Sequence, residues 1–264
     1  MTLAVLAARY WPFANGSGRI IDRFARGVDL GQGERLAQTS DGFALRVRAD
    51  DLIGRHILLT GRFDRSVVQV LLDHARPGDV LLDIGANIGY VAACFLSRIA
   101  DSSAICVEPQ PEIVDLLEAN MAPFGDRVAI HRVALSDAAG EVRFRIDQAN
   151  RGASRIDADG EFAVPAMHAG ELLAGLPRLD LIKMDVEGHE ETVFRAIDVQ
   201  LARLAPRAIL FEDQGAGAAE AIGALLHRHR YTVFGIDKRL LRTRLVPIVS
   251  SGDCRYNDYL AVRT

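Results

Sequence analysis

The stretch VLLDIGANIGY, residues 80–90, decides the fold because an apolar run passes directly into a helix through a glycine-rich turn. Its first half predicts a buried strand, and residues 90–99 are apolar at helical spacing. Between them, Gly85 and Gly89 let the backbone come close to a ligand, and Asn87 tolerates a left-handed backbone that most residues resist. Ligands of such sheets bind where the carboxyl ends of strands open, so we expect a ligand site at this turn.

The spacing within the turn separates classes of ligand. A dinucleotide-binding turn reads G-x-G-x-x-G, with a helix amino terminus aimed at the pyrophosphate. Here the pattern is D-x-G-x-N-x-G, and Val91 and Ala92 stand where a further glycine would be needed. We also expect Asp83 to sit inside the cleft, where its charge repels a pyrophosphate but suits a cationic amino acid group. The pattern disfavours an NAD-dependent oxidoreductase, which is kept as an alternative.

From this turn to the end of the chain, short apolar runs alternate with longer amphipathic runs. This alternation predicts an α/β fold with a doubly wound, mainly parallel sheet of seven strands. The expected strands lie at residues 80–85, 104–109, 127–135, 179–186, 208–212, 231–236 and 257–262. We also expect a strand at 141–146, a half-buried strand that begins at Phe43, and a helix over 64–75.

The composition is that of an ordinary globular protein. Of 264 residues, 49% are hydrophobic and 25% are charged, which excludes a disordered or collagen-like chain. No apolar run is long enough to predict a bilayer span. The net charge of −4 gives no overall field to hold a polyphosphate, so we expect no nucleic-acid partner and no integral membrane association.

The basic residues are almost all arginines, and the chain has three cysteines. Only Lys183 and Lys238 among the 31 basic residues are lysines, and we interpret the arginine excess as codon bias of a GC-rich genome. The three cysteines are widely spaced and form no metal-binding pattern. The first residues lack the basic segment of a signal peptide, so the sequence predicts a cytoplasmic protein.

Glu108 ends the second strand, 25 residues beyond Asp83, within the stretch VEPQP. An acidic side chain at this position is placed to accept hydrogen bonds from both ribose hydroxyls of a nucleoside. We therefore expect Glu108, followed by Pro109, on the ribose side of the cleft.

The stretch KMDVEGHEE, residues 183–191, brings four carboxylates and one imidazole to the end of the fourth strand. Glu190 and Glu191 are interpreted as charges that favour the start of a helix. Asp185 and Glu187 come earlier and are expected to face the cleft. His189 is either a base near neutral pH or an exposed turn histidine, and the sequence leaves both interpretations open.

Four ordered blocks resemble the FkbM-type methyltransferases, which use S-adenosylmethionine. They are DIGANIGY, VEPQPEIVDLLEANM, VALSDAAGEVRF and LIKMDVEGHEETVF. The resemblance covers about residues 57–264, including GRFDRSV, in which Asp64 stands where the family usually has Glu, and the closing YNDYLAV. It implies a Rossmann-like methyltransferase domain over 61–264, preceded by an N-terminal cap or extension over 1–60.

The same resemblance implies the cofactor S-adenosyl-L-methionine and its contacts. Gly85, Asn87 and Gly89 would surround the methionine portion, with Asp83 beside them. Glu108 would bind the ribose. The loop Ala134-Leu135-Ser136 would lie near the adenine. For the catalytic base, Asp185 is the first candidate, Glu187 the second and His189 the third.

The expected reaction is O-methylation of a sugar, a glycolipid or another small molecule. A cofactor-binding protein without transferase activity is the alternative from a different class. No metal site is expected, because HExxH and Cys/His clusters are absent, although Asp185, Glu187 and Glu212 could together hold a divalent cation. No [DN]PP[YFW] block and no P-loop motif occur.

The first 60 residues are the least readable part of the chain. Tyr10, Trp11 and Phe13 could cover the cleft and contact the substrate, or they could form a packed cap or a dimer contact. Both interpretations stay open, and a homodimer is possible. The expected partner is a small-molecule or glycan acceptor, whose identity the sequence does not give.

Overall fold

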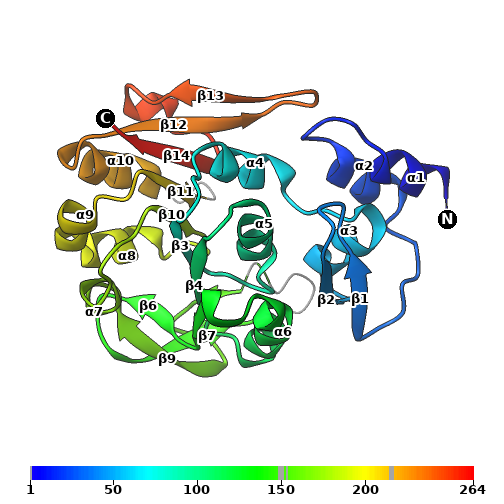
Figure 1. Cartoon of the computed structure of the whole chain (residues 1–264), viewed down its shortest axis with the longest axis horizontal. Helices are drawn as coiled ribbons and strands as arrows, with labels where there is room; N and C mark the ends of the chain where they lie inside the picture. Colours follow the sequence, from blue (N-terminus) through cyan, green and yellow to red (C-terminus); the bar gives the residue numbers. More distant parts are fainter. Residues whose placement is uncertain (1, 148–151, 153, 214–216) are drawn as a thin grey trace.

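The computed structural model describes residues 2–147, 152, 154–213 and 217–264. Its main sheet has eight strands in the order β13-β12-β14-β11-β10-β3-β4-β5 (Figure 1). Their bounds are β3 (Val80–Ile84), β4 (Ser103–Val107), β5 (Val128–His131), β10 (Leu181–Met184), β11 (Ala208–Glu212), β12 (Tyr231–Lys238), β13 (Thr243–Pro247) and β14 (Asp258–Arg263). The five strands from β11 to β5 are parallel, whereas β14 is antiparallel to both of its neighbours. The predicted doubly wound, mainly parallel sheet is confirmed, with β13 as an additional edge strand.

Helices cover both faces of this sheet, as Figure 1 shows. One face packs on α4 (Arg65–Asp73), α5 (Tyr90–Arg98) and α6 (Pro111–Met121), and the other on α7 (Ala169–Ala174), α8 (Glu190–Ala196), α9 (Asp198–Leu204) and α10 (Ala218–Arg228). Neighbouring strand residues serve opposite layers: Leu81 joins the first core and Leu82 the second. This two-sided burial explains the continuous apolar runs of the central strands.

The expected strand at 127–135 is in fact two strands. After β5, the chain breaks at Arg132, whose guanidinium pairs with Asp115 and Glu118 of α6. It continues as β6 (Ala134–Ser136), which leaves the main sheet and pairs with β9 (Phe162–His168). β7 (Gly140–Arg145) and β8 (Arg155–Ile156) complete this four-stranded sheet, in the order β6-β9-β7-β8. The strand predicted at 141–146 is thus present, but outside the main sheet.

The N-terminal segment consists of α1 (Leu3–Arg9), α2 (Ser17–Phe24), β1 (Glu34–Gln38), β2 (Ala44–Arg48) and α3 (Leu52–Thr60). The first two helices form a small core with Leu59 of α3. Leu45 of β2 and Ile57 of α3 instead join the core beneath the main sheet. A division of the chain near residue 60 stays a prediction.

Within the described residues, no helix combines the length and the apolar character needed to span a bilayer.

Candidate active site

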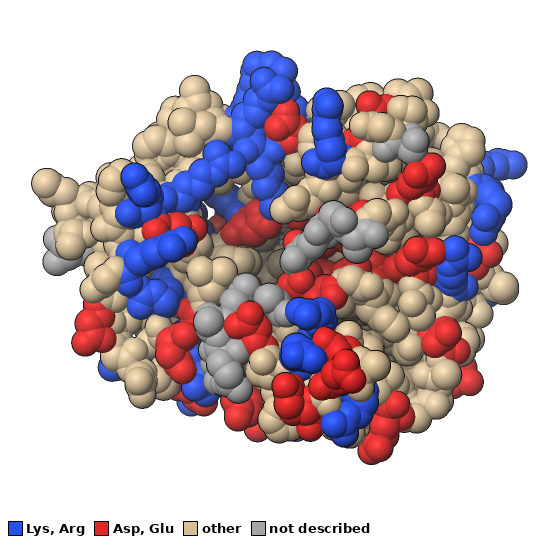
Figure 2. Space-filling model, turned by 180° about the vertical axis from the view of Figure 1, so that it is seen from behind, with Lys and Arg blue, Asp and Glu red and all other residues tan. Residues whose placement is uncertain are grey.

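A cleft of about 1200 Å³, counted to its open mouth, lies where β3, β4, β10 and β11 end. The topology brings these carboxyl ends to one edge of the sheet, because the four strands are parallel neighbours. Figure 2 shows a hollow on this face with acidic side chains beside it. Eight of the residues predicted for the site are among its lining: Gly85, Asn87, Glu108, Pro109, Ala134, Leu135, Asp185 and Glu187.

The turn after β3 approaches the end of β10 very closely. A Cβ atom on Gly85 would lie 1.8 Å from the carbonyl oxygen of Asp185, so only glycine fits here. Asn87 has a φ of 49° and accepts a hydrogen bond from the Ile88 N–H through its side chain, at 2.8 Å. The turn therefore holds Gly85, Asn87 and Asp185 on one wall of the cleft.

Gly89 does not line the cleft. It caps α5 with a φ of 83°, and a Cβ atom there would lie 2.7 Å from Leu117 and 2.8 Å from Met121 of α6. Close packing between α5 and α6 therefore requires this glycine. The second glycine of the turn thus faces the helix layer, and its contact with the ligand stays a prediction.

Glu108 is a buried carboxyl at the wall of the cleft. Its Oε2 accepts a hydrogen bond from the Asn87 N–H and its Oε1 accepts one from the Gln110 N–H, both at 3.0 Å. Only 4% of the residue is exposed. Burial raises the pKa of Glu108 to about 7, although the two N–H groups act in the opposite direction. These two bonds fix the carboxyl and leave one lone pair on each oxygen available for a ligand.

Ser136 and His189 face each other outside the cleft. Their Oγ and Nε2 atoms are 3.0 Å apart, and the Ser136 hydroxyl also lies 3.1 Å from Asp137. Burial lowers the pKa of His189. Neither side chain is part of the lining, whereas Ala134 and Leu135 are. The structure therefore separates His189, and Ser136 with it, from the other predicted site residues.

Asp83 lies beneath the cleft, with no exposed surface. The Nζ atom of Lys183 is 3.4 Å from Asp83 and 3.5 Å from Asp185, and it donates a hydrogen bond of 2.8 Å to the carbonyl oxygen of Gly85. Burial raises the pKa of Asp83 even though Lys183 opposes it. Asp83 is expected inside the cleft, but this is wrong: its side chain is buried beneath the cleft, where it pairs with Lys183.

Three carboxyl groups cross the sheet edge side by side, and we name them the acidic row: Asp185, Glu212 and Asp258. Asp185 and Glu212 directly follow the paired residues Met184 and Phe211 of β10 and β11. Glu212 in turn pairs in register with Asp258 of β14. All three line the cleft.

Crowding in the acidic row disfavours negative charge. Burial, followed by the charges of Asp185 and Asp258, raises the pKa of Glu212 to about 10. Burial and Asp185 raise the pKa of Glu187 to about 8. Glu187 also has a φ of 53°, a conformation that costs free energy outside glycine and that clusters at functional sites. Burial raises the pKa of Asp258 to about 6.

The second lysine of the chain meets the acidic row at its far end. The Nζ atom of Lys238 is 2.7 Å from Asp258 and 2.7 Å from Asp64, which precedes α4. Burial alone would lower the pKa of Lys238, but the two carboxylates hold it above its ordinary value. Lys238 thereby ties the start of α4 to the C-terminal strands beside the cleft.

Sequence reasoning missed both lysines, Asp258, and the part that Glu212 plays in the acidic row. A signal was present: the only two lysines in an arginine-rich chain both contact carboxylates at the cleft. Glu190 and Glu191 do lie in the first turn of α8, as predicted. Glu190 accepts hydrogen bonds from the N–H groups of Val186 and Gly188, at 3.0 Å each, and so closes the turn.

Two further expectations concern the cap and a metal. Tyr10, Trp11 and Phe13 do not line the cleft, whereas Ile53 and Phe63 do. The Trp11 ring packs edge-on against Phe13, at 5.5 Å between centroids, as in a packed cap. In the described part of the chain, no group of three or more His, Cys, Asp or Glu side chains is placed to hold a metal ion. The alternative set of Asp185, Glu187 and Glu212 therefore forms no such group.

Comparison with known proteins places the cleft in a known family. The model of the methyltransferase FkbM domain matches residues 83–233. The hexuronic acid methyltransferase AglP of Haloferax volcanii is 32% identical over 139 residues, which is 52% of this chain and 57% of that protein. The 2-O-methyltransferase NoeI of Sinorhizobium fredii is 31% identical over 150 residues, which is 49% of this chain and 60% of that protein. The matches thus span less than two thirds of either relative.

Among solved structures, a SAM-dependent O-methyltransferase from Thermotoga maritima aligns with a TM-score of 0.44 at 16% identity, over 89% of this chain and 78% of that one. Because the family match covers more than half of the sequence and includes the turn, Glu108 and the acidic end of β10, this chain belongs to the methyltransferase FkbM domain family.

Proposed function

We propose that the protein transfers a methyl group from S-adenosylmethionine to a hydroxyl oxygen of a sugar or related polar molecule. The observation that carries this proposal is the polarity of one cleft. A fixed carboxyl, Glu108, lies on the β4 side, and the acidic row begins at Asp185 on the β10 side. The two named relatives, a hexuronic acid methyltransferase and a 2-O-methyltransferase, support the choice of reaction.

The residues present fit S-adenosylmethionine. Glu108 offers two carboxyl oxygens to the ribose hydroxyls, and backbone N–H groups already hold that carboxyl in place. Val107, Pro109, Ala134 and Leu135 offer an apolar wall for the adenine ring. The turn at Gly85 and Asn87 would hold the methionine portion. When bound, the cofactor supplies a reactive methyl group on a positively charged sulfur.

Asp185 is the residue that we assign as the proton acceptor. An alcohol is a poor nucleophile unless its proton is withdrawn as the new bond forms, and a positioned carboxylate contributes about 10²–10⁴-fold to the rate. The ammonium group of Lys183, 3.5 Å away, pairs with the Asp185 carboxylate and fixes its direction. The acceptor oxygen would lose its proton to Asp185 while its lone pair forms the bond to the methyl carbon, and the carbon–sulfur bond would break to leave S-adenosylhomocysteine. Glu187 is the second candidate because it also lines the cleft.

Calorimetric titration tests the cofactor half of this proposal. We expect S-adenosylhomocysteine to bind and NADH not to bind. Tight NADH binding without S-adenosylhomocysteine binding would contradict the proposal and favour the oxidoreductase.

Transfer of a labelled methyl group into an extract of the source cells tests the reaction half. A labelled ether product supports a transferase. Bound cofactor without any labelled product would favour a binding protein without transferase activity.

A further inference from the structure

The cleft holds very few cations for a chain so rich in arginine. The protein has 31 basic residues, yet among the described residues that line the cleft the only basic one is Lys183. Lys238 reaches the cleft through Asp64 and Asp258, which are lining residues. Arg155 acts on Glu187 from outside the lining and is 3.7 Å from Asp157.

Both lysines are already neutralised by the protein. Lys183 lies between Asp83 and Asp185 and also donates to the Gly85 carbonyl. Lys238 lies between Asp64 and Asp258. Each ammonium group is therefore matched by two carboxyl groups, so among the described residues of the lining no excess positive charge is left for an anionic ligand.

The acceptor end of the cleft instead offers oxygen atoms that need donors. The Asp185 side chain is 33% exposed and lines the cleft, so its carboxylate presents an acceptor there. An ionised carboxylate accepts hydrogen bonds and donates none, so it favours a ligand that brings donors, such as a sugar hydroxyl. An additional carboxylate in this place would meet like charges at short range and would bring no donor when ionised.

The raised pKa values of Glu212 and Glu187 agree with this description. Burial and neighbouring carboxyl groups raise both pKa values, so the lining disfavours any further negative charge.

We infer that the acceptor is a sugar or polyol that brings hydrogen-bond donors and no negative charge at the methylated unit, and that uronic acids are excluded. This inference rests on the proposed function. It covers neutral sugars and amino sugars, whose hydroxyl or ammonium groups supply the same donors. The inferred acceptor therefore differs from the hexuronic acid for which the relative AglP is named.

The test uses the full chain with labelled S-adenosylmethionine and a glycan and glycolipid extract of the source cells. Acid hydrolysis of the products releases single sugars but keeps methyl ethers, and chromatography then separates neutral, amino and uronic sugars. We expect the label in the neutral or the amino fraction, and the two fractions distinguish these sources. Label in the uronic fraction, or label lost as methanol from a methyl ester, would overturn the inference and leave the cofactor assignment intact.

The absence of label is also decisive. If no sugar is labelled by protein that binds S-adenosylhomocysteine, the inference fails together with the proposed reaction. If S-adenosylhomocysteine does not bind, the cofactor assignment fails first. Calorimetry on the same protein sample separates these two failures.

A charge-removing variant then shows whether the acidic row causes the discrimination. Rates are compared at pH 8 for the labelled sugar and for its C6-oxidised uronic counterpart. In Asp258→Asn we expect the preference for the uncharged sugar to fall by about tenfold, as for one removed like-charge contact. Asp64→Asn serves as the second variant should Asp258→Asn not fold.

The matched control is Asp237→Asn on β12, which removes a carboxylate that pairs with Arg239 outside the lining. Its preference should equal that of the unmodified protein. Equal turnover of the two sugars by the unmodified protein would overturn the inference.

Discussion

The two edges of the main sheet differ in how well their charged side chains are paired. At the amino ends, Asp79, Asp180 and Arg207 directly precede β3, β10 and β11. At the carboxyl ends, the acidic row and Lys183 occupy the same region of the sheet. The same central strands therefore carry charged groups at both ends, and the cleft lies at their carboxyl ends.

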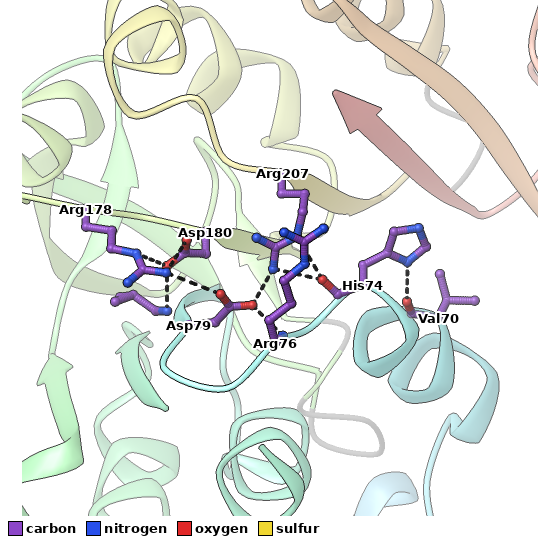
Figure 3. Close-up of polar contacts among 8 residues, drawn as sticks. Val70, His74, Arg76, Asp79, Arg178, Asp180 and Arg207 are labelled. Atoms are coloured by element: carbon purple, nitrogen blue, oxygen red, sulfur yellow. Dashed lines mark hydrogen bonds and ion pairs between the residues drawn. The ribbon is translucent and has the colours of Figure 1, made fainter. Parts of the chain in front are cut away.

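The amino edge is a closed network, shown in Figure 3. Asp79 is 1% exposed, accepts a hydrogen bond of 2.7 Å from the Arg76 N–H, and pairs with Arg207 and with Arg178. Arg178 also pairs with Asp180 at 2.7 Å. Each charge meets an opposite charge or a backbone group, so this edge stabilises the sheet.

The carboxyl edge is unbalanced by comparison. Burial and neighbouring carboxyl groups raise the pKa values of Glu212 and Glu187, and Asp185 shares the cation of Lys183 with Asp83. An excess of carboxyl groups of this kind costs stability and is typical of a site that is completed by a ligand. The candidate functional edge of this sheet thus differs from the other edge in unmatched charge, and not in the amount of charge.

The largest expected effect is that of Asp185→Asn on turnover. The change keeps the shape and removes the proton acceptor, so we expect kcat to fall by about 10²–10⁴-fold. The affinity for S-adenosylhomocysteine should change much less, because Glu108 and the turn remain. Rates of labelled methyl transfer and calorimetry measure the two quantities.

Glu187→Gln is the matched comparison for this prediction, because it removes a second lining carboxyl at the same strand end. Unchanged turnover in Asp185→Asn, with and without a chelator, would exclude Asp185 from the mechanism and leave Glu187 as the base.

At the amino edge, Asp79→Asn should destabilise the fold without affecting the site. The change leaves Arg207 and Arg178 without their shared carboxylate, and breaking a buried ion pair costs about 3–5 kcal/mol. Denaturant unfolding measures this loss, with the exposed Asp73→Asn of α4 as the control. The affinity of the folded fraction for S-adenosylhomocysteine should not change; a weaker affinity would show that the two edges are coupled.

Glu108→Ala should weaken S-adenosylhomocysteine binding by about 1–3 kcal/mol, because the ribose hydroxyls lose a charged acceptor. Hydrogen bonds from the ribose favour the ionised carboxyl, so binding to the unmodified protein should tighten as pH rises through about 7. Glu108→Gln should remove this pH dependence. Glu118→Gln, on the exposed side of α6, is the control, and an equal loss in that variant would contradict the assignment.

A further effect concerns the pH dependence of stability. Burial and the charges of Asp185 and Asp258 raise the pKa of Glu212 from 4.5 to about 10 in the folded protein. The folded state then binds more protons than the unfolded state, so the free energy of unfolding should decrease as pH rises from about 5 towards 10. Glu212→Gln should flatten this decrease in denaturant titrations between pH 5 and 9, whereas Glu191→Gln should not. An unchanged slope would mean that Glu212 ionises freely.

Much of the fold and half of the site could be predicted from the sequence. Glu108 and Asp185 were found because each directly follows a buried strand, and the carboxyl ends of parallel strands meet at one edge. The family resemblance implies Gly89 and Ser136 at the cofactor, and His189 is a candidate because it belongs to the stretch 183–191. Which way each of them faces depends on the packing of α6 and on the path of β6.

The rest required strand order and register. Asp64, Lys238 and Asp258 are far apart in the sequence, and they meet only because β14 lies between β11 and β12. Lys183 belongs to a buried strand, where sequence patterns predict an apolar residue. Its role follows from its register beside Asp83, since these two residues pair across β10 and β3.

The most direct test of the central claim is a crystal structure of the protein with S-adenosylhomocysteine. The account predicts both ribose hydroxyls within hydrogen-bond distance of the Glu108 carboxyl, the adenine against Ala134 and Leu135, and the sulfur on the side of Asp185. A ligand bound away from Glu108, or an adenine ring seated on the acidic row, would contradict it.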